Sequence, residues 1–132
     1  MTTVAITPAV AEAIAEIRAT FDEARVAVRE DGEGGAYVRV EPVDPGSPYA
    51  QRETWIGFRI TAQYPYADVY PLFVRHDLSR ATGEPLGEGM TPGHTFDGQP
   101  AVQVSRRSNH LNPATDTAAI KVLKVLDWMA SR

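Results

Sequence analysis

The stretch WIGFRITAQYPYADVYPLFV, residues 55–74, holds two apolar strands separated by a segment that cannot stay in a sheet. In the first strand apolar and polar residues alternate, which is typical of a strand with one buried face. That face is formed by Ile56, Phe58 and Ile60. Pro65 and Pro71 then remove backbone donors, so the chain between them must leave the sheet. A fourth strand is predicted over residues 70–76.

Towards the N-terminus the pattern predicts a hairpin preceded by a helix. Residues 25–30 and 36–43 alternate with period two on either side of the turn-forming DGEGG. Before them, Thr7 followed by Pro8 is a typical helix start. Apolar residues at spacings of three and four then predict a helix with one buried face, namely Val10, Ile14, Ile17 and Phe21.

Towards the C-terminus the sequence predicts a long connection, a short strand and a second helix. Residues 78–98 carry five glycines and are expected to form a loop, either a lid, an interface or a mobile segment. A strand is predicted over 101–104, and a helix from Asn112-Pro113 onward. The expected apolar face of this helix is Ala119, Val122, Leu123, Leu126 and either Met129 or Ala130.

Together these elements predict an α+β fold with an N-terminal helix, a four-stranded antiparallel meander, an irregular flap and long loop, and a C-terminal helix. We expect residues 1–132 to form a single domain, because the chain has an ordinary domain length and no internal repeat.

Composition excludes several classes of function. The net charge of −4 offers no basic stripe for phosphates, so nucleic acid is not an expected partner. No apolar run is long enough to span a bilayer and the first residues do not form a leader, so we expect a cytoplasmic protein with no membrane partner. The absence of cysteine excludes disulfides, thiolate metal sites and a cysteine nucleophile. No cofactor or metal is predicted.

The order of elements and three local segments resemble the ubiquitin-conjugating enzyme family and its relatives, the RWD domains. Residues 55–74 are similar to the third strand, flap and fourth strand of that family, with Tyr64-Pro65 at its Tyr-Pro pair and Pro71 near a later flap proline. LNPATDTAAIKVLKVLDWM resembles the helix that follows its active site. The resemblance implies that Tyr64, Pro65, Tyr66, Tyr70 and Pro71 form a partner-binding flap.

The residues that carry the family's chemistry are replaced. His94 to Val102 resemble the stretch that leads to the catalytic cysteine, with Gly98 at a glycine turn and Ala101 at the position of the cysteine. Thr95 and Phe96 stand where the family has its Pro-Asn pair. A thiolate is required to carry an acyl group as a thioester, and alanine cannot do so. The resemblance therefore implies a degenerate active-site groove formed by His94, Gly98, Ala101, Arg106 and His110.

Two functional hypotheses follow. In the first, the protein is not an enzyme but a binding or adaptor module for a ubiquitin-like protein or another conjugation-pathway partner. In the second, it is a small hydrolase-type enzyme with a pocket around His94, Arg106 and His110, assisted by Asp97. The Arg106-Arg107 pair could also hold a carboxylate or phosphate, or simply be solvated. The first hypothesis requires no nucleophile, and we favour it.

Overall fold

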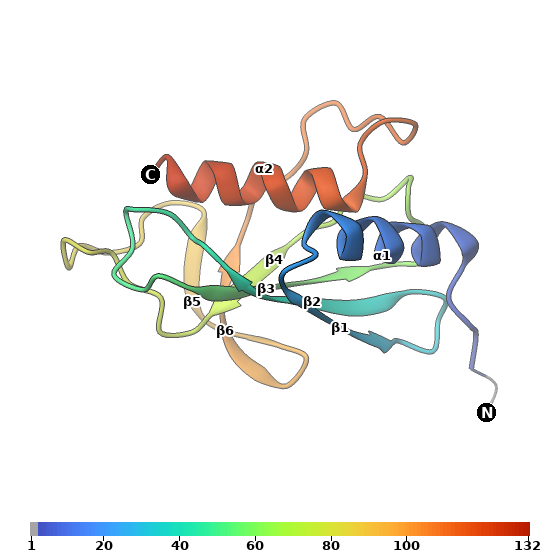
Figure 1. Ribbon diagram of the computed structural model, residues 1–132, viewed down its shortest axis with the longest axis horizontal. Helices are drawn as coiled ribbons and strands as arrows, with labels where there is room; N and C mark the ends of the chain where they lie inside the picture. The colour runs from blue at the N-terminus through green and yellow to red at the C-terminus, as the bar shows by residue number, and fades with distance from the viewer. Residues whose placement is uncertain (1–2) are drawn as a thin grey trace.

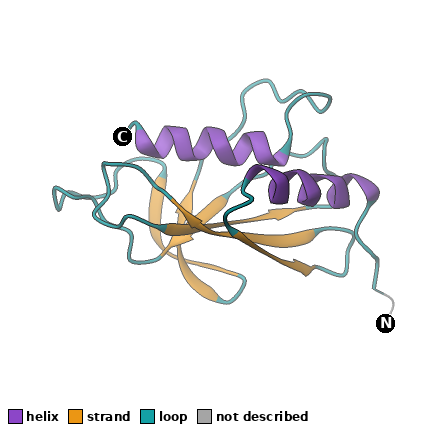
Figure 2. Ribbon diagram, in the orientation of Figure 1, coloured by secondary structure: helices purple, strands orange, loops and turns teal. Residues whose placement is uncertain are grey.

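The computed structural model describes residues 3–132 and shows two helices packed on one face of a six-stranded sheet (Figures 1 and 2). The elements in chain order are α1 (Pro8–Thr20), β1 (Arg25–Glu30), β2 (Ala36–Val43), β3 (Thr54–Ile60), β4 (Leu72–Arg75), β5 (Met90–Phe96), β6 (Gln99–Val104) and α2 (Ala118–Ala130). All strand pairs are antiparallel, and the order across the sheet is β1-β2-β3-β4-β6-β5. The α+β class is confirmed.

The helix and the hairpin predicted for the first part of the chain are confirmed, except that Phe21 lies just after α1 as its C-cap and is only partly buried. Thr7 caps α1 by accepting a hydrogen bond from the Val10 N–H at 3.1 Å, with Pro8 in the first turn. In the hairpin between β1 and β2, the carboxylate of Asp31 accepts from the backbone N–H groups of Glu33 and Gly35. These bonds close the turn that the glycine-rich sequence predicts.

The prediction of a four-stranded sheet with a loop over residues 78–98 is wrong. Residues 90–96 form β5, which pairs with β6 and extends the sheet to six strands. The two-residue turn between them is Asp97-Gly98, with φ angles of +46° and +80°. Asp-Gly in this conformation is a typical hairpin connection. The strand before it was predicted as a loop because it contains Pro92 and Gly93, which are uncommon in strands. The ladder is irregular between Thr91 and His94, where these two residues lie.

The predicted start of the second helix at Asn112-Pro113 is also wrong. Residues 112–116 form a separate turn, in which Asn112 accepts hydrogen bonds from the Asp116 and Ala114 N–H groups. Thr117 is the N-cap, and α2 begins at Ala118. Its buried side is formed by Ala118, Ala119, Lys121, Val122, Val125 and Met129, whereas Leu123 is 46% exposed.

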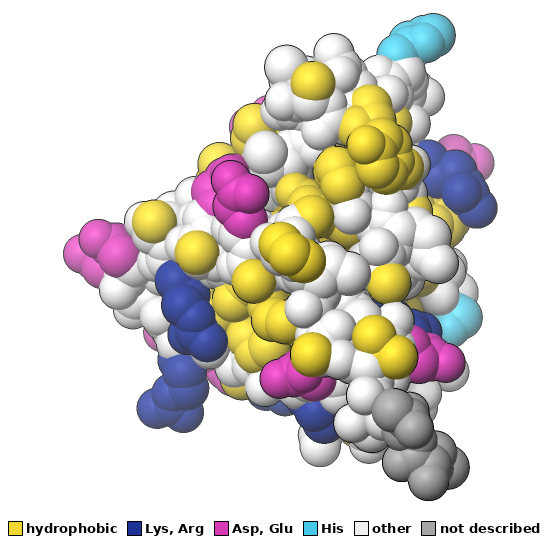
Figure 3. Space-filling view, turned by 90° about the vertical axis from the view of Figure 1, so that its right-hand side faces the viewer, with side chains coloured by type: hydrophobic (Ala, Val, Ile, Leu, Met, Phe, Trp, Pro, Cys, Tyr) yellow, Lys and Arg dark blue, Asp and Glu magenta, His cyan; other side chains and the backbone are white. Residues whose placement is uncertain are grey.

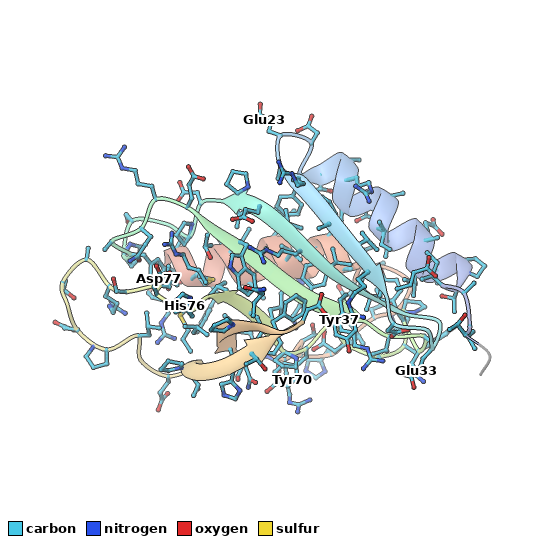
Figure 4. The ribbon with its side chains drawn as sticks, turned by 90° about the horizontal axis from the view of Figure 1, so that it is seen from below. Glu23, Glu33, Tyr37, Tyr70, His76 and Asp77 are labelled. Atoms are coloured by element: carbon cyan, nitrogen blue, oxygen red, sulfur yellow. The ribbon has the colours of Figure 1, made fainter. Side chains whose placement is uncertain are left out.

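Two apolar clusters lie on opposite faces of the sheet. The larger one fills the space between the sheet and both helices. The smaller one consists of Trp55, Phe96 and Ala101, flanked by Tyr37 and Phe73. It lies on the face that the helices leave uncovered, which Figure 4 shows with Tyr37 labelled. Phe96 belongs to the edge strand β5 but its ring lies against Gly57 of β3, so the β5–β6 hairpin curls across this face. At its tip, Asp97 accepts a hydrogen bond from Arg29 of β1, the opposite edge strand.

Candidate functional site

The segment between β3 and β4, residues 61–71, is the predicted flap, and it is docked against the beginning of α2. The hydroxyl oxygen of Tyr64 accepts the backbone N–H of Ala118 at 3.0 Å. This N–H belongs to the first turn of α2 and has no partner within the helix. Burial raises the pKa of Tyr64, so its hydroxyl stays neutral. Both flap bonds Tyr64-Pro65 and Tyr70-Pro71 are cis.

A buried ion pair fixes the flap a second time. Lys121 Nζ of α2 lies 3.1 and 3.0 Å from the two carboxylate oxygens of Asp68 and 3.0 Å from the Ser108 hydroxyl. Ser108 in turn donates to the Asp68 carboxylate from its backbone N–H at 2.7 Å and from its hydroxyl at 2.8 Å. These three residues, which we call the clamp, join the flap, the 105–117 loop and α2.

The clamp does not have the electrostatics of a serine–lysine hydrolase. Burial alone would raise the pKa of Asp68, but hydrogen bonds from Ser108 and from Lys121 outweigh it and lower the pKa below its usual value. Lys121 Nζ donates to both oxygens of this carboxylate and to the Ser108 hydroxyl, so within the cluster the lysine serves as a hydrogen-bond donor. The Ser108 hydroxyl donates its proton to Asp68 rather than to a base. The role of the cluster is therefore structural: it holds the flap and the 105–117 loop against α2.

Beside the clamp, exposed apolar side chains lie among polar and charged ones. Tyr66, at the tip of the flap, has 78% of its side chain exposed, and Ile120 and Leu123 are exposed on α2. Ile120 lines a shallow depression with Ala67 of the flap and Leu111 of the 105–117 loop. We call Tyr66, Ala67, Leu111, Ile120 and Leu123 the flap end. Figure 3 views this end of the molecule and shows hydrophobic side chains gathered over it between isolated charged ones.

The five residues of the predicted groove are not brought together. Ala101 is 1% exposed in β6 and packs with Trp55 and Phe96 on the uncovered sheet face. His94 stands opposite Ala101 on β5, and Gly98 lies at the hairpin tip. Arg106 instead stacks on Trp128 of α2, on the helix side of the sheet. A side chain at position 101 therefore points into a packed cluster rather than into an open groove.

The residues of the alternative hydrolase pocket are also separated. His110 lies exposed in the 105–117 loop, and His94 lies on the hairpin that crosses the other face. The cleft that Arg106 lines contains no histidine. Within residues 3–132, no group of three or more His, Asp or Glu side chains is placed to hold a metal ion.

The uncovered sheet face carries a hollow of about 540 Å³ beside His76 and Asp77, at the end of the sheet shown in Figure 4. Its arginines are paired: Arg75 with Asp77, and Arg39 with Glu41. Nearby, Arg59 lies between Asp31 and Glu33. The hollow is also lined by Glu53, whose carboxylate is not paired with a cation of residues 3–132, so its lining carries one more negative than positive group.

Sequence reasoning missed Asp68 and Lys121. A signal for Lys121 was present, because it falls among the apolar positions of its helix and a buried lysine requires a partner. No comparable signal identified Asp68, which lies 53 residues away along the chain.

No family model, curated protein or solved structure matches this chain. Among residues 3–132, neither helix has the length and apolar character needed to cross a bilayer.

Proposed function

We propose that the protein is a non-catalytic protein-binding module that contacts its partner through the flap end. The observation that supports this most directly is the exposure of Tyr66 on a segment that is fixed on both sides. Tyr64 is bonded to α2 before it, and Asp68 is clamped after it. An exposed tyrosine on a fixed backbone loses little conformational entropy on binding, and tyrosine is enriched among residues that dominate binding energy.

Neighbouring charges indicate the chemistry of the partner. Lys124 is exposed on α2 and lines the same depression as Ile120. Arg107 stacks on the flap residue Tyr70, with its guanidinium carbon 4.1 Å from the ring centre. A partner that presents apolar side chains surrounded by acidic residues would complement this surface.

The resemblance to ubiquitin-conjugating enzymes supplies the class of partner. It makes a ubiquitin-like protein, or another component of a conjugation pathway, the first candidate for the flap end. Because Ala101 takes the position of the family's cysteine, the module would bind such a partner without accepting an acyl group from it. The proposed activity is recognition, and the protein is an adaptor rather than an enzyme.

The test is a titration of the ¹⁵N-labelled protein with ubiquitin and with ubiquitin-like proteins from the same source organism. We expect saturable shifts of the amide signals of Tyr66, Ile120 and Leu123. Tyr66→Ala is expected to weaken binding at least about tenfold, as for a central aromatic contact, without lowering stability. Tyr66→Phe should retain most of the affinity, and Arg52→Ala, in the exposed loop before β3, should retain all of it. Binding that persists in Tyr66→Ala would contradict the proposed surface.

A further inference from the structure

A second cleft, which adjoins the flap-end depression and shares Ser108, Asp116, Lys121 and Lys124 with it, has the properties of an anion site. This cleft, of about 250 Å³, lies between residues 106–109 and one side of α2. Its positive side chains are Arg106, Arg107, Lys121 and Lys124. The nearby carboxylates are Asp116, which lines the cleft, and Asp68, which is bonded to Lys121. Four positive and two negative groups leave a local charge of +2 in a chain whose net charge is −4.

The two arginines of the cleft are held in place by aromatic rings and not by carboxylates. Arg107 stacks on Tyr70, and the guanidinium carbon of Arg106 lies 4.8 Å from the centre of the Trp128 ring. Neither guanidinium is paired with a carboxylate of residues 3–132. Stacking occupies the flat face of a guanidinium and leaves the N–H donors at its edge free for a ligand.

Lys124 adds a third positive group that is only weakly engaged. Its Nζ lies 4.0 Å from the Asp116 carboxylate, and its side chain is 70% exposed. A weak, exposed pair of this kind contributes little and is readily exchanged for a better partner. Lys121, by contrast, is held by Asp68 and serves to fix the wall of the cleft.

We propose that this cleft binds a phosphoryl group carrying two negative charges, as inorganic phosphate or as a small phosphate monoester. A tetrahedral phosphoryl group offers oxygens in several directions and can accept from two guanidinium edges and an ammonium together. A carboxylate has two oxygens in one plane and would leave one of these groups without a partner. Stacking fixes both arginines before the ligand arrives, which lowers the entropic cost of binding. The proposal does not depend on the protein-binding function.

The test is a titration of the ¹⁵N-labelled protein with sodium phosphate and, separately, with sodium acetate, with ionic strength held constant by sodium chloride. We expect saturable amide shifts confined to residues 106–109 and 121–125, stronger for phosphate than for acetate. If O-phospho-L-serine binds more tightly than inorganic phosphate, the ligand is a phosphate monoester whose organic group contacts the rest of the cleft. Equal binding would assign the site to free phosphate.

Two variants and one control complete the experiment. Arg106→Gln and Arg107→Gln are each expected to weaken phosphate binding at least about tenfold, since each removes hydrogen bonds to a charged group. Arg52→Gln removes an exposed arginine elsewhere and should change nothing. Shifts that fail to saturate, that are equally strong with acetate, or that survive both glutamine substitutions would overturn the proposal.

Discussion

At the residue scale, the position of the flap depends on Lys121. This side chain is only 8% exposed and neutralises Asp68, which is 19% exposed. Replacing Lys121 by Met preserves volume and helix propensity but leaves Asp68 ionised without its cation. Removing one partner of a buried pair costs about 3–5 kcal/mol, so Lys121→Met should lower the free energy of unfolding by about 3 kcal/mol. Urea denaturation at pH 7 measures the change.

Lys124→Met is the matched control on the same helix. Lys124 is exposed and forms only a 4.0 Å pair with Asp116. Its replacement should change stability by less than about 0.5 kcal/mol. If the two methionine variants were equally stable, the clamp would not be a stabilising feature of the fold.

The clamp also predicts a dependence of stability on pH. The pKa of Asp68 is raised by burial but lowered further by Ser108 and Lys121, and therefore lies below its unfolded value. Between the two values the unfolded chain binds more protons, so stability is complete above the unfolded pKa and is lost as pH falls through the folded one. We expect urea midpoints to fall between about pH 5 and pH 2.

Carboxyl NMR titrations can assign this effect to single residues. In Lys121→Met the folded pKa of Asp68 should rise, because a cation that favours the ionised form is gone. Asp31 provides an internal reference. Its pKa is raised by burial but lowered further by the backbone N–H groups of Glu33 and Gly35 and by Arg59, none of which the substitution changes. A shift at Asp31 equal to that at Asp68 would indicate global loosening and contradict the assignment.

At the element scale, the packing of the β5–β6 hairpin against the sheet requires a glycine at position 57. A Cβ atom at Gly57 would lie 2.5 Å from Cε2 of Phe96, so an alanine there must displace the ring. Phe96 also stacks on Phe73, with ring centres 5.3 Å apart, and its displacement would loosen the smaller apolar cluster. Overpacking of this kind costs about 1–3 kcal/mol, which is the loss of stability we expect for Gly57→Ala.

A double-mutant cycle tests the cause. In Phe96→Ala the ring is absent, so adding Gly57→Ala to this variant should cost little. The expected result is therefore a large coupling between the two positions. Additive effects would mean that Gly57 is required for a reason other than contact with Phe96.

The same hairpin shows where reading the sequence succeeded and where it failed. Elements with strict periodicity, such as α1, β1 and β2, were predicted to within a residue or two because their signals are local. β5 was missed because Pro92 and Gly93 are typical of loops, although the Asp97-Gly98 turn signal was available. Asn112-Pro113 has the residues of a helix start, but Asn112 uses its side chain in a separate turn.

At the scale of the whole molecule, the curl of the sheet and the clamp could not be predicted from the sequence. The sheet order places β1 and β5 at opposite edges, yet Arg29 and Asp97 meet across the uncovered face. Contacts between residues so far apart along the chain produce no periodic pattern in the sequence, so they cannot be predicted from it. For the same reason, the sequence predicted that the segment between β3 and β4 leaves the sheet, but it gave no indication of Asp68, the residue that ties this segment to α2.

The molecule thus has an uncovered sheet face closed by packed aromatic rings and, away from it, a flap end with an exposed tyrosine. The measurement that tests this account most directly compares the affinity for a ubiquitin-like protein of the unaltered chain, Tyr66→Ala and Lys121→Met. We predict that Tyr66→Ala weakens binding at least about tenfold while its stability is unchanged, and that Lys121→Met weakens binding because the flap loosens. Unchanged affinity in both variants, or no saturable binding by the unaltered chain, would contradict the claim that the flap end is a protein-binding surface for such a partner.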